Sequence, residues 1–208
     1  MIRPRRYGDA GQAFPIYITV VGGLLFLAFA YFAVGQAAAN RNGAQTAADA
    51  AALAAAQDRR EQLAGAWVES VLDPTKWRQI FEGNADGLAP SCWRAQELAG
   101  RNDAHLAGIE CIPDGLLGFK VEVESNKPVG ESIVPGTEKQ QANATAAAVI
   151  EPRCDFDPLG DDAGPDVLPK LVCDGGVEWE LKPDDLDVLP KPEDLFDVHL
   201  ADSQANDE

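Results

Sequence analysis

The chain of 208 residues carries 34 acidic and 17 basic side chains, a formal net charge of −17. This acidity excludes nucleic acid as a partner, because a polyanion repels it and no basic patch with interleaved aromatic residues offsets the repulsion. Residues 155–208 hold 17 of the acidic side chains and only three basic ones, so most of the excess lies in the last quarter of the chain.

The first predicted element is a membrane-spanning helix over residues 14–36. No charged residue lies between Asp9 and Arg41, and the run "FPIYITVVGGLLFLAFAYFAVG" is long enough to cross the hydrocarbon core of a bilayer, which takes about 20 residues. Three arginines precede the run and only Arg41 closely follows it. This bias predicts a basic cytoplasmic N-terminus at residues 1–13 and an extracytoplasmic remainder.

A secretory signal peptide is the alternative for this segment. Such a peptide would use the same arginines and would be cut after Ala39, at the end of "AAA". Its apolar region is normally about 7 to 15 residues, shorter than the run here. We therefore expect a permanent anchor, with a secreted acidic protein as the alternative.

Residues 37–73 are predicted to continue the helix as an alanine-rich stalk. Good helix formers run without a strong stop as far as Asp73 and Pro74, and only "NRNG" at 40–43 offers a break. A continuous helix from 14 to 72 would be about 90 Å long. We expect no single small domain to bury a helix of that length.

Small side chains recur along this stalk at intervals of seven residues. Ala37, Ala44 and Ala51 form one series, and Ala47 and Ala54 form another. Stripes of small residues let two helices approach closely, so we expect this one to pack tightly against another helix. The plainer interpretation is an alanine-rich composition.

Asp49 lies within this alanine-rich stretch. We expect it to set the register of the packing or to cap a hydrogen bond near the membrane surface. A solvated carboxylate on the exposed side of the helix remains the alternative.

A small extracytoplasmic α+β domain is expected over residues 74–181. Short helices are predicted at 75–83 and 90–100, and "GFKVEVES" at 118–125 alternates as a half-buried strand does. The segment 137–152 is ambiguous. A capping box and its alanines favour a helix, but its apolar residues also recur at period two, and the residues alone favour the helix slightly.

Four cysteines lie in this part of the chain, at Cys92, Cys111, Cys154 and Cys173. They form no Cys-x-x-Cys unit, and with two histidines in the chain a zinc site is poorly supported. An even number in an extracytoplasmic segment indicates two disulfides. Of three connectivities the sequential pairing, Cys92 with Cys111 and Cys154 with Cys173, is the simplest.

Residues 182–208 are expected to form an acidic disordered tail. The segment is rich in Asp and Pro, with a near-repeat of "KPDDL" and "KPEDL", and such a composition buries little apolar surface. Upstream, "VEWEL" at 177–181 is a possible strand. The acidic loop 155–166 has Leu159 where a calcium loop needs an oxygen ligand, so no metal site is expected.

The N-terminal run "GDAGQAFPIYITVVGGLLFLAFAYFAVGQAAANRNGAQTAADAAALAAA" resembles the TadE/TadG-type module of bacterial tight-adherence (Tad, or Flp) pilus assembly proteins. Gln45 and the segment from Ala47 to Leu53 match the family pattern. The resemblance implies that 118–125 and 142–152 are paired β-strands, which reverses the preference for a helix in the second segment. It also implies a long N-terminal helix anchoring a small α+β domain with a short antiparallel sheet, pinned by its disulfides. With this resemblance, we expect the alanine stripe to pack against a second copy or a pilin-like partner.

One departure from the pilin pattern bears on mechanism. Prepilins cut by prepilin peptidase typically carry Glu at the fifth mature position. Cutting after Gly11 would place Ile16 there, and cutting after Gly8 would place Ala13 there. The resemblance therefore implies an uncleaved anchor or accessory assembly protein rather than a major pilus subunit.

No catalytic signature accompanies these features. The chain has no P-loop, no Gly-x-Ser-x-Gly and no His-Glu-x-x-His, and His105 is expected at the surface or half-buried. We expect a non-enzymatic, cofactor-free, single-pass protein of the bacterial cell membrane that serves a Tad/Flp pilus or related secretion apparatus. The alternative is a membrane-tethered binding module whose acidic tail gathers cations or a basic envelope partner.

Overall fold

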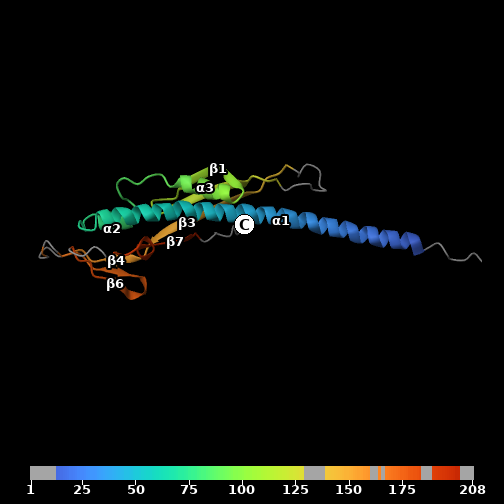
Figure 1. The fold of residues 1–208 in the computed structure, drawn as a ribbon. Helices are drawn as coiled ribbons and strands as arrows, with labels where there is room; N and C mark the ends of the chain where they lie inside the picture. Colours follow the sequence, from blue (N-terminus) through green and yellow to red (C-terminus); the bar gives the residue numbers. More distant parts are fainter. Residues whose placement is uncertain (1–12, 129–138, 160–163, 165–166, 184–188, 202–208) are drawn as a thin grey trace, which may run out of the picture.

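A computed structural model describes residues 13–128, 139–159, 164, 167–183 and 189–201. The fold is α+β, with one long helix followed by antiparallel strands (Figure 1). The elements are α1 (Ala13–Glu69), α2 (Trp77–Phe81), α3 (Cys92–Arg101), β1 (Ala104–Pro113), β2 (Gly118–Ser125), β3 (Asn143–Pro152), β4 (Cys154–Phe156), β5 (Leu171–Cys173), β6 (Val177–Trp179), α4 (Pro192–Leu195) and β7 (Phe196–Leu200). The cleavage positions at Gly8 and Gly11, and residues 160–163 and 165–166 of the acidic loop, lie outside the described residues.

α1 is a single helix of 57 residues, so the predicted continuity between the apolar run and the alanine-rich segment is confirmed. The "NRNG" stretch at 40–43 stays helical. The chain leaves the helix shortly before Pro74, as the sequence predicts. At this end the hydroxyl of Thr75 donates to the carboxylate of Asp73, and this hydrogen bond lowers the pKa of Asp73.

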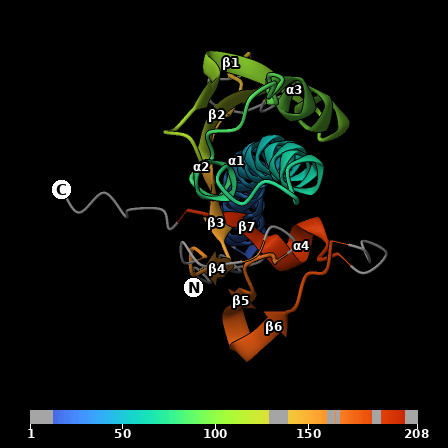
Figure 2. The same ribbon diagram turned by 90° about the vertical axis from the view of Figure 1, so that its left-hand side faces the viewer.

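A four-stranded antiparallel sheet curls around the second half of α1, in the order β1-β2-β3-β7 (Figure 2). β2 and β3 pair from Gly118 opposite Val149 to Glu124 opposite Asn143. The strand assignment implied for 142–152 is therefore confirmed, against the slight preference for a helix. The inward residues of β2, Phe119, Val121 and Val123, are almost fully buried, because alternate side chains of a strand face the helix.

The alanine-rich segment of α1 is the centre of the domain. The sheet covers one side of it and α3 packs against another (Figure 2). Between residues 47 and 56, Ala47, Ala48, Ala51, Ala52, Ala55 and Ala56 are each 0 % exposed. The expectation of a stalk that no small domain could bury is therefore wrong from Ala44 onward. Side chains of one carbon let the sheet and α3 approach the helix closely from two sides.

The C-terminal segment is also part of the core. β7 pairs with β3 from Leu200 opposite Ala148 to Phe196 opposite Pro152, and Leu195 and Phe196 are 0 % exposed. The prediction of a disordered tail over 182–208 is wrong for residues 189–201, while 184–188 and 202–208 lie outside the described residues. The alternation in "FDVHL" supplies the apolar face that the acidic composition obscured.

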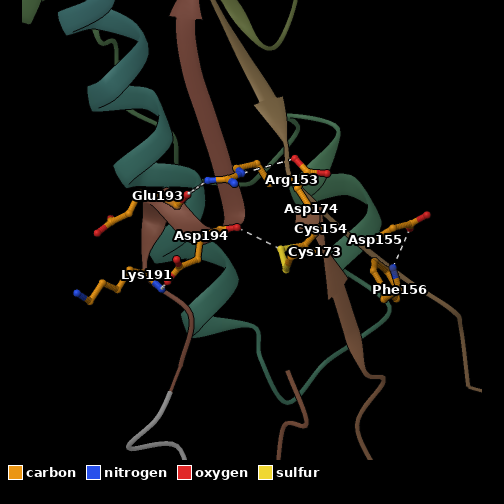
Figure 3. Close-up of a disulfide and its surroundings, with 9 residues drawn as sticks. All are labelled: Arg153, Cys154, Asp155, Phe156, Cys173, Asp174, Lys191, Glu193 and Asp194. Carbon is orange, nitrogen blue, oxygen red and sulfur yellow. Dashed lines mark hydrogen bonds and ion pairs between the residues drawn. A yellow bond between two sulfur atoms is a disulfide. The ribbon is translucent and has the colours of Figure 1, made fainter. Parts of the chain in front are cut away.

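Two disulfides tie the outer elements to this core, in the sequential pairing. Cys92–Cys111 joins α3 to β1, and Cys154–Cys173 joins β4 to β5 in a small second sheet of order β4-β5-β6. Figure 3 shows the second disulfide beside α4, where Cys154 Sγ lies 3.3 Å from the carbonyl oxygen of Asp194. Each bridge closes a loop with a sequence separation of 19. In the chain-entropy view such a loop stabilises the fold by about 3 kcal/mol.

We predict that Phe196→Ala destabilises the domain strongly, because it removes a fully buried aromatic ring that packs 5.4 Å from Phe81 between ring centroids. The expected loss in the free energy of unfolding is about 3–5 kcal/mol. Asp197→Ala is the matched control, since Asp197 is exposed on the same strand. The measurement is denaturant unfolding of the full chain in detergent micelles. Equal stability of the two variants would mean that the strand is not part of the core.

Candidate functional site

The first half of α1 exposes a long apolar surface. Large side chains from Phe14 to Val34 stand free of the domain, with Phe14 71 % and Tyr31 84 % exposed. α1 is long and apolar enough to cross a membrane, and none of its most apolar stretch of 18 residues is buried. In the core helix of a soluble domain this stretch would be covered by other elements, and soluble proteins rarely expose apolar patches of this size. This half of α1 is therefore the first part of the candidate site.

The second part is the junction where α1 enters the domain. Ala44 is the first buried residue of α1, only eight positions after Gln36. One helical turn earlier, the side-chain amide of Asn40 donates to the carbonyl oxygen of Pro128, 3.1 Å away. The domain therefore begins within about 12 Å of the apolar segment, at a helical rise of 1.5 Å per residue.

Gln45 and Asp49 form a clamp between this junction and β3. The Nε2 atom of Gln45 donates to Asp49 Oδ1 at 2.8 Å and to the carbonyl oxygen of Thr145 at 3.3 Å. Both protons of one amide nitrogen are thus used, and the carboxylate orients the amide. Asp49 thus accepts a hydrogen bond from Gln45 on its own helix.

The clamp lies just beyond the last described pairing of β7 with β3. The register of β7 on β3 ends at Ala148, and the N–H of Ala201 still bonds to the carbonyl of Ala147. Thr145 lies two residues beyond that point, where its carbonyl has no strand partner on the β7 side among the described residues. Within the described residues, Gln45 satisfies this carbonyl with a side chain from the helix.

The predicted packing residues divide between the two parts of α1. Ala44, Ala47, Ala51 and Ala54 are at most 6 % exposed, covered by the chain's own sheet and α3, whereas Ala37 is exposed. The alanines do serve close packing. The expectation that this part of the stripe meets a second copy or a pilin-like partner is wrong for those four, because their surface is already occupied.

Sequence reasoning missed Asn40, Pro128 and Thr145. Their contacts join segments about 90 to 100 residues apart, so no local pattern marks them. Of the residues in these contacts, only Gln45 and Asp49 were identified from the sequence, as part of the family pattern. One helical turn separates them, which is the spacing at which side chains on a helix meet.

The described titratable groups lie apart from one another or in surface pairs. Within the ranges that the structure describes, no three His, Cys, Asp or Glu side chains are placed to hold a metal ion. His105 is exposed, as expected, and its Nδ1 lies 2.8 Å from Asn126 Oδ1, whereas His199 lies on β7 beside Asp197. These contacts place both imidazoles in polar surface pairs.

Part of the chain matches a model of a known protein family. Residues 11–58 match the Tad family model, described as Flp pilus-assembly TadE/G-like. The match covers the exposed half of α1, the junction and the clamp residues, and it confirms the resemblance over this segment. No curated protein and no solved structure matches the chain significantly. A Tad-type segment with a candidate membrane helix supports a role in pilus assembly.

We predict that Asp49→Ala and Gln45→Ala each lower the free energy of unfolding by about 1 kcal/mol, the net contribution of a typical hydrogen bond. The double variant should lose little more than either single variant, because both changes remove the same clamp. Gln57→Ala, at an exposed position of α1, is the control and should have almost no effect. Fully additive losses, measured by denaturant unfolding in micelles, would contradict a shared clamp.

Proposed function

We propose that this chain, with its Tad-type segment at residues 11–58, is a non-enzymatic single-pass membrane protein that acts in the assembly of a Tad/Flp-type pilus or a related secretion apparatus. The observation that carries the proposal is that the matched segment includes both the exposed apolar half of α1 and the clamp that joins it to the domain. The family match suggests that the process is pilus assembly, and the exposed apolar helix suggests that the chain acts at a membrane.

The proposed orientation has the N-terminus in the cytoplasm and the domain outside. Three arginines precede the apolar run, and positively charged flanks are retained on the cytoplasmic side. Two disulfides in the domain support the same orientation, because disulfides persist in oxidising compartments.

Partner contacts are proposed to fall on the membrane half of α1. The alanine surface beyond Ala44 is covered by the domain, so the exposed part before it is what remains for a pilin-like protein, another assembly component or a second copy. Gly22, Gly23 and Gly35 have open space where a side chain would point, which leaves room for a neighbouring helix.

The two alternatives have less support. A binding module built on a free acidic tail would need residues 189–201 to be available, and they are paired into the sheet and core. A secreted form cut after Ala39 would require cleavage inside the continuous helix, immediately before Asn40 and its bond to Pro128.

The function is tested by photo-crosslinking in the cells that carry the gene. A crosslinking amino acid at Phe26, 66 % exposed on the membrane half of α1, should capture a pilus-assembly component or a second copy. The same group at Gln57, exposed on the domain half, should not. Deletion of the gene should also reduce piliation, and the intact gene should restore it. Normal piliation together with lipid adducts alone at Phe26 would overturn the proposed function.

Orientation has its own test. We predict that a Lys76→Cys variant reacts with a membrane-impermeant maleimide added to intact spheroplasts, because Lys76 is exposed at the far end of the domain. A cysteine introduced at Arg5 should react only after permeabilisation. The reverse pattern of labelling would invert the proposed topology.

A further inference from the structure

The position of the domain along α1 has a consequence for the membrane, given the proposed span. Residues 14–36 rise by about 35 Å as a helix, slightly more than the roughly 30 Å hydrocarbon core. A modest tilt accommodates such an excess. The hydrocarbon boundary on the outer side therefore lies near Gln36, and the polar headgroup layer beyond it covers about three to five further residues of α1.

The domain already contacts α1 at that depth. Asn40 bonds to Pro128, and a recess of about 200 Å³ opens beside it between the helix and the base of the domain. The recess is lined by Ala39, Asn40, Gly43, Ala44, Asn102, Asp103, Ala104, Ser125 and Lys127.

We propose that this basal surface, formed by Asn40, residues 102–104 and residues 125–128, lies in the phospholipid headgroup layer and that lipid headgroups occupy its recess. The inference rests on the proposed membrane span and adds a second contact between protein and bilayer. The domain would then contact the membrane surface directly, whereas an exposed stalk helix would separate the domain from the membrane.

The chemistry of the basal surface suits a zwitterionic headgroup. Lys127 Nζ lies 3.0 Å from Asp103 Oδ2, and the two side chains are 75 % and 73 % exposed. They offer an ammonium to a lipid phosphate and a carboxylate to a choline or ethanolamine cation. Since the two charges balance, the contact does not require anionic lipid.

The unbroken helix fixes the height of this surface. α1 continues through residues 40–43 with no hinge, and Asn40 ties its side chain to the domain just beyond the span. Nothing lies within 4 Å of the position that a Cβ on Gly43 would take, so the recess is open beside the helix. Lifting the domain off the headgroups would require α1 to break or to leave the bilayer.

Depth-dependent fluorescence quenching tests this arrangement with the full chain in phosphatidylcholine nanodiscs. Three variants, Phe26→Cys, Lys127→Cys and Lys76→Cys, are labelled with a thiol-reactive fluorophore, while the native cysteines remain in their disulfides. Nitroxide-bearing lipids quench either from the headgroup or from the acyl chain. An Asn126→Cys variant provides a second position on the basal surface.

The expected result is loss of fluorescence at 127 and 126 with headgroup nitroxide, and no loss at 76. The same quenching of the basal labels should persist without anionic lipid. Unquenched basal labels, or quenching at 76 as well, would overturn the inference. Phe26 reports separately on the span: if the acyl-chain nitroxide fails to quench its label, the proposed membrane anchor itself fails.

Discussion

The close approach of the sheet and α3 to the alanine segment of α1 determines the rest of this structure. A helix with larger side chains between residues 47 and 56 would hold both layers further out, since protein interiors are packed without room for extra carbon atoms. With alanine at these positions, one helix becomes the core of a domain whose sheet wraps around it. The larger side chains that complete the core, among them Trp67, Trp77 and Phe196, are fully buried nearer the distal end of α1.

The sequence predicted the elements with clear periodicity and missed those whose signal depends on distant partners. Alternation marked β2, and the absence of charge marked the exposed half of α1. β1 was missed because its pairing shifts between Leu106 and Cys111, where Gly108 and Glu110 have positive φ and break the alternation. β7 was missed because overall acidity was given more weight than the alternation of five residues.

The site was predictable only as far as its local part. Gln45 and Asp49 lie one turn apart on the same face, so a pattern could connect them with each other. The hydrogen bond from Gln45 to the carbonyl of Thr145 could not be predicted from this pattern, because it depends on where β3 lies in the sheet and against α1. The partner assigned to the alanine stripe was wrong for a related reason: a small-residue stripe shows that something approaches closely, and it does not say whether that is another chain or the same one.

α1 thus has an exposed apolar surface in its first half and a buried alanine surface in its second half, and the clamp lies near the boundary between them. Before Asn40 the apolar side chains of α1 face outward, and from Ala44 its small side chains face inward. Because α1 continues through residues 40–43, the direction of its apolar half and the position of the domain are set by one continuous helix. Asn40 and Gln45 tie the helix to the domain at this point, since Asn40 donates to the carbonyl of Pro128 and Gln45 to that of Thr145, while Asp49 accepts a hydrogen bond from Gln45. If the proposed membrane span is correct, a partner that contacts the apolar half of α1 would therefore also influence where the domain lies.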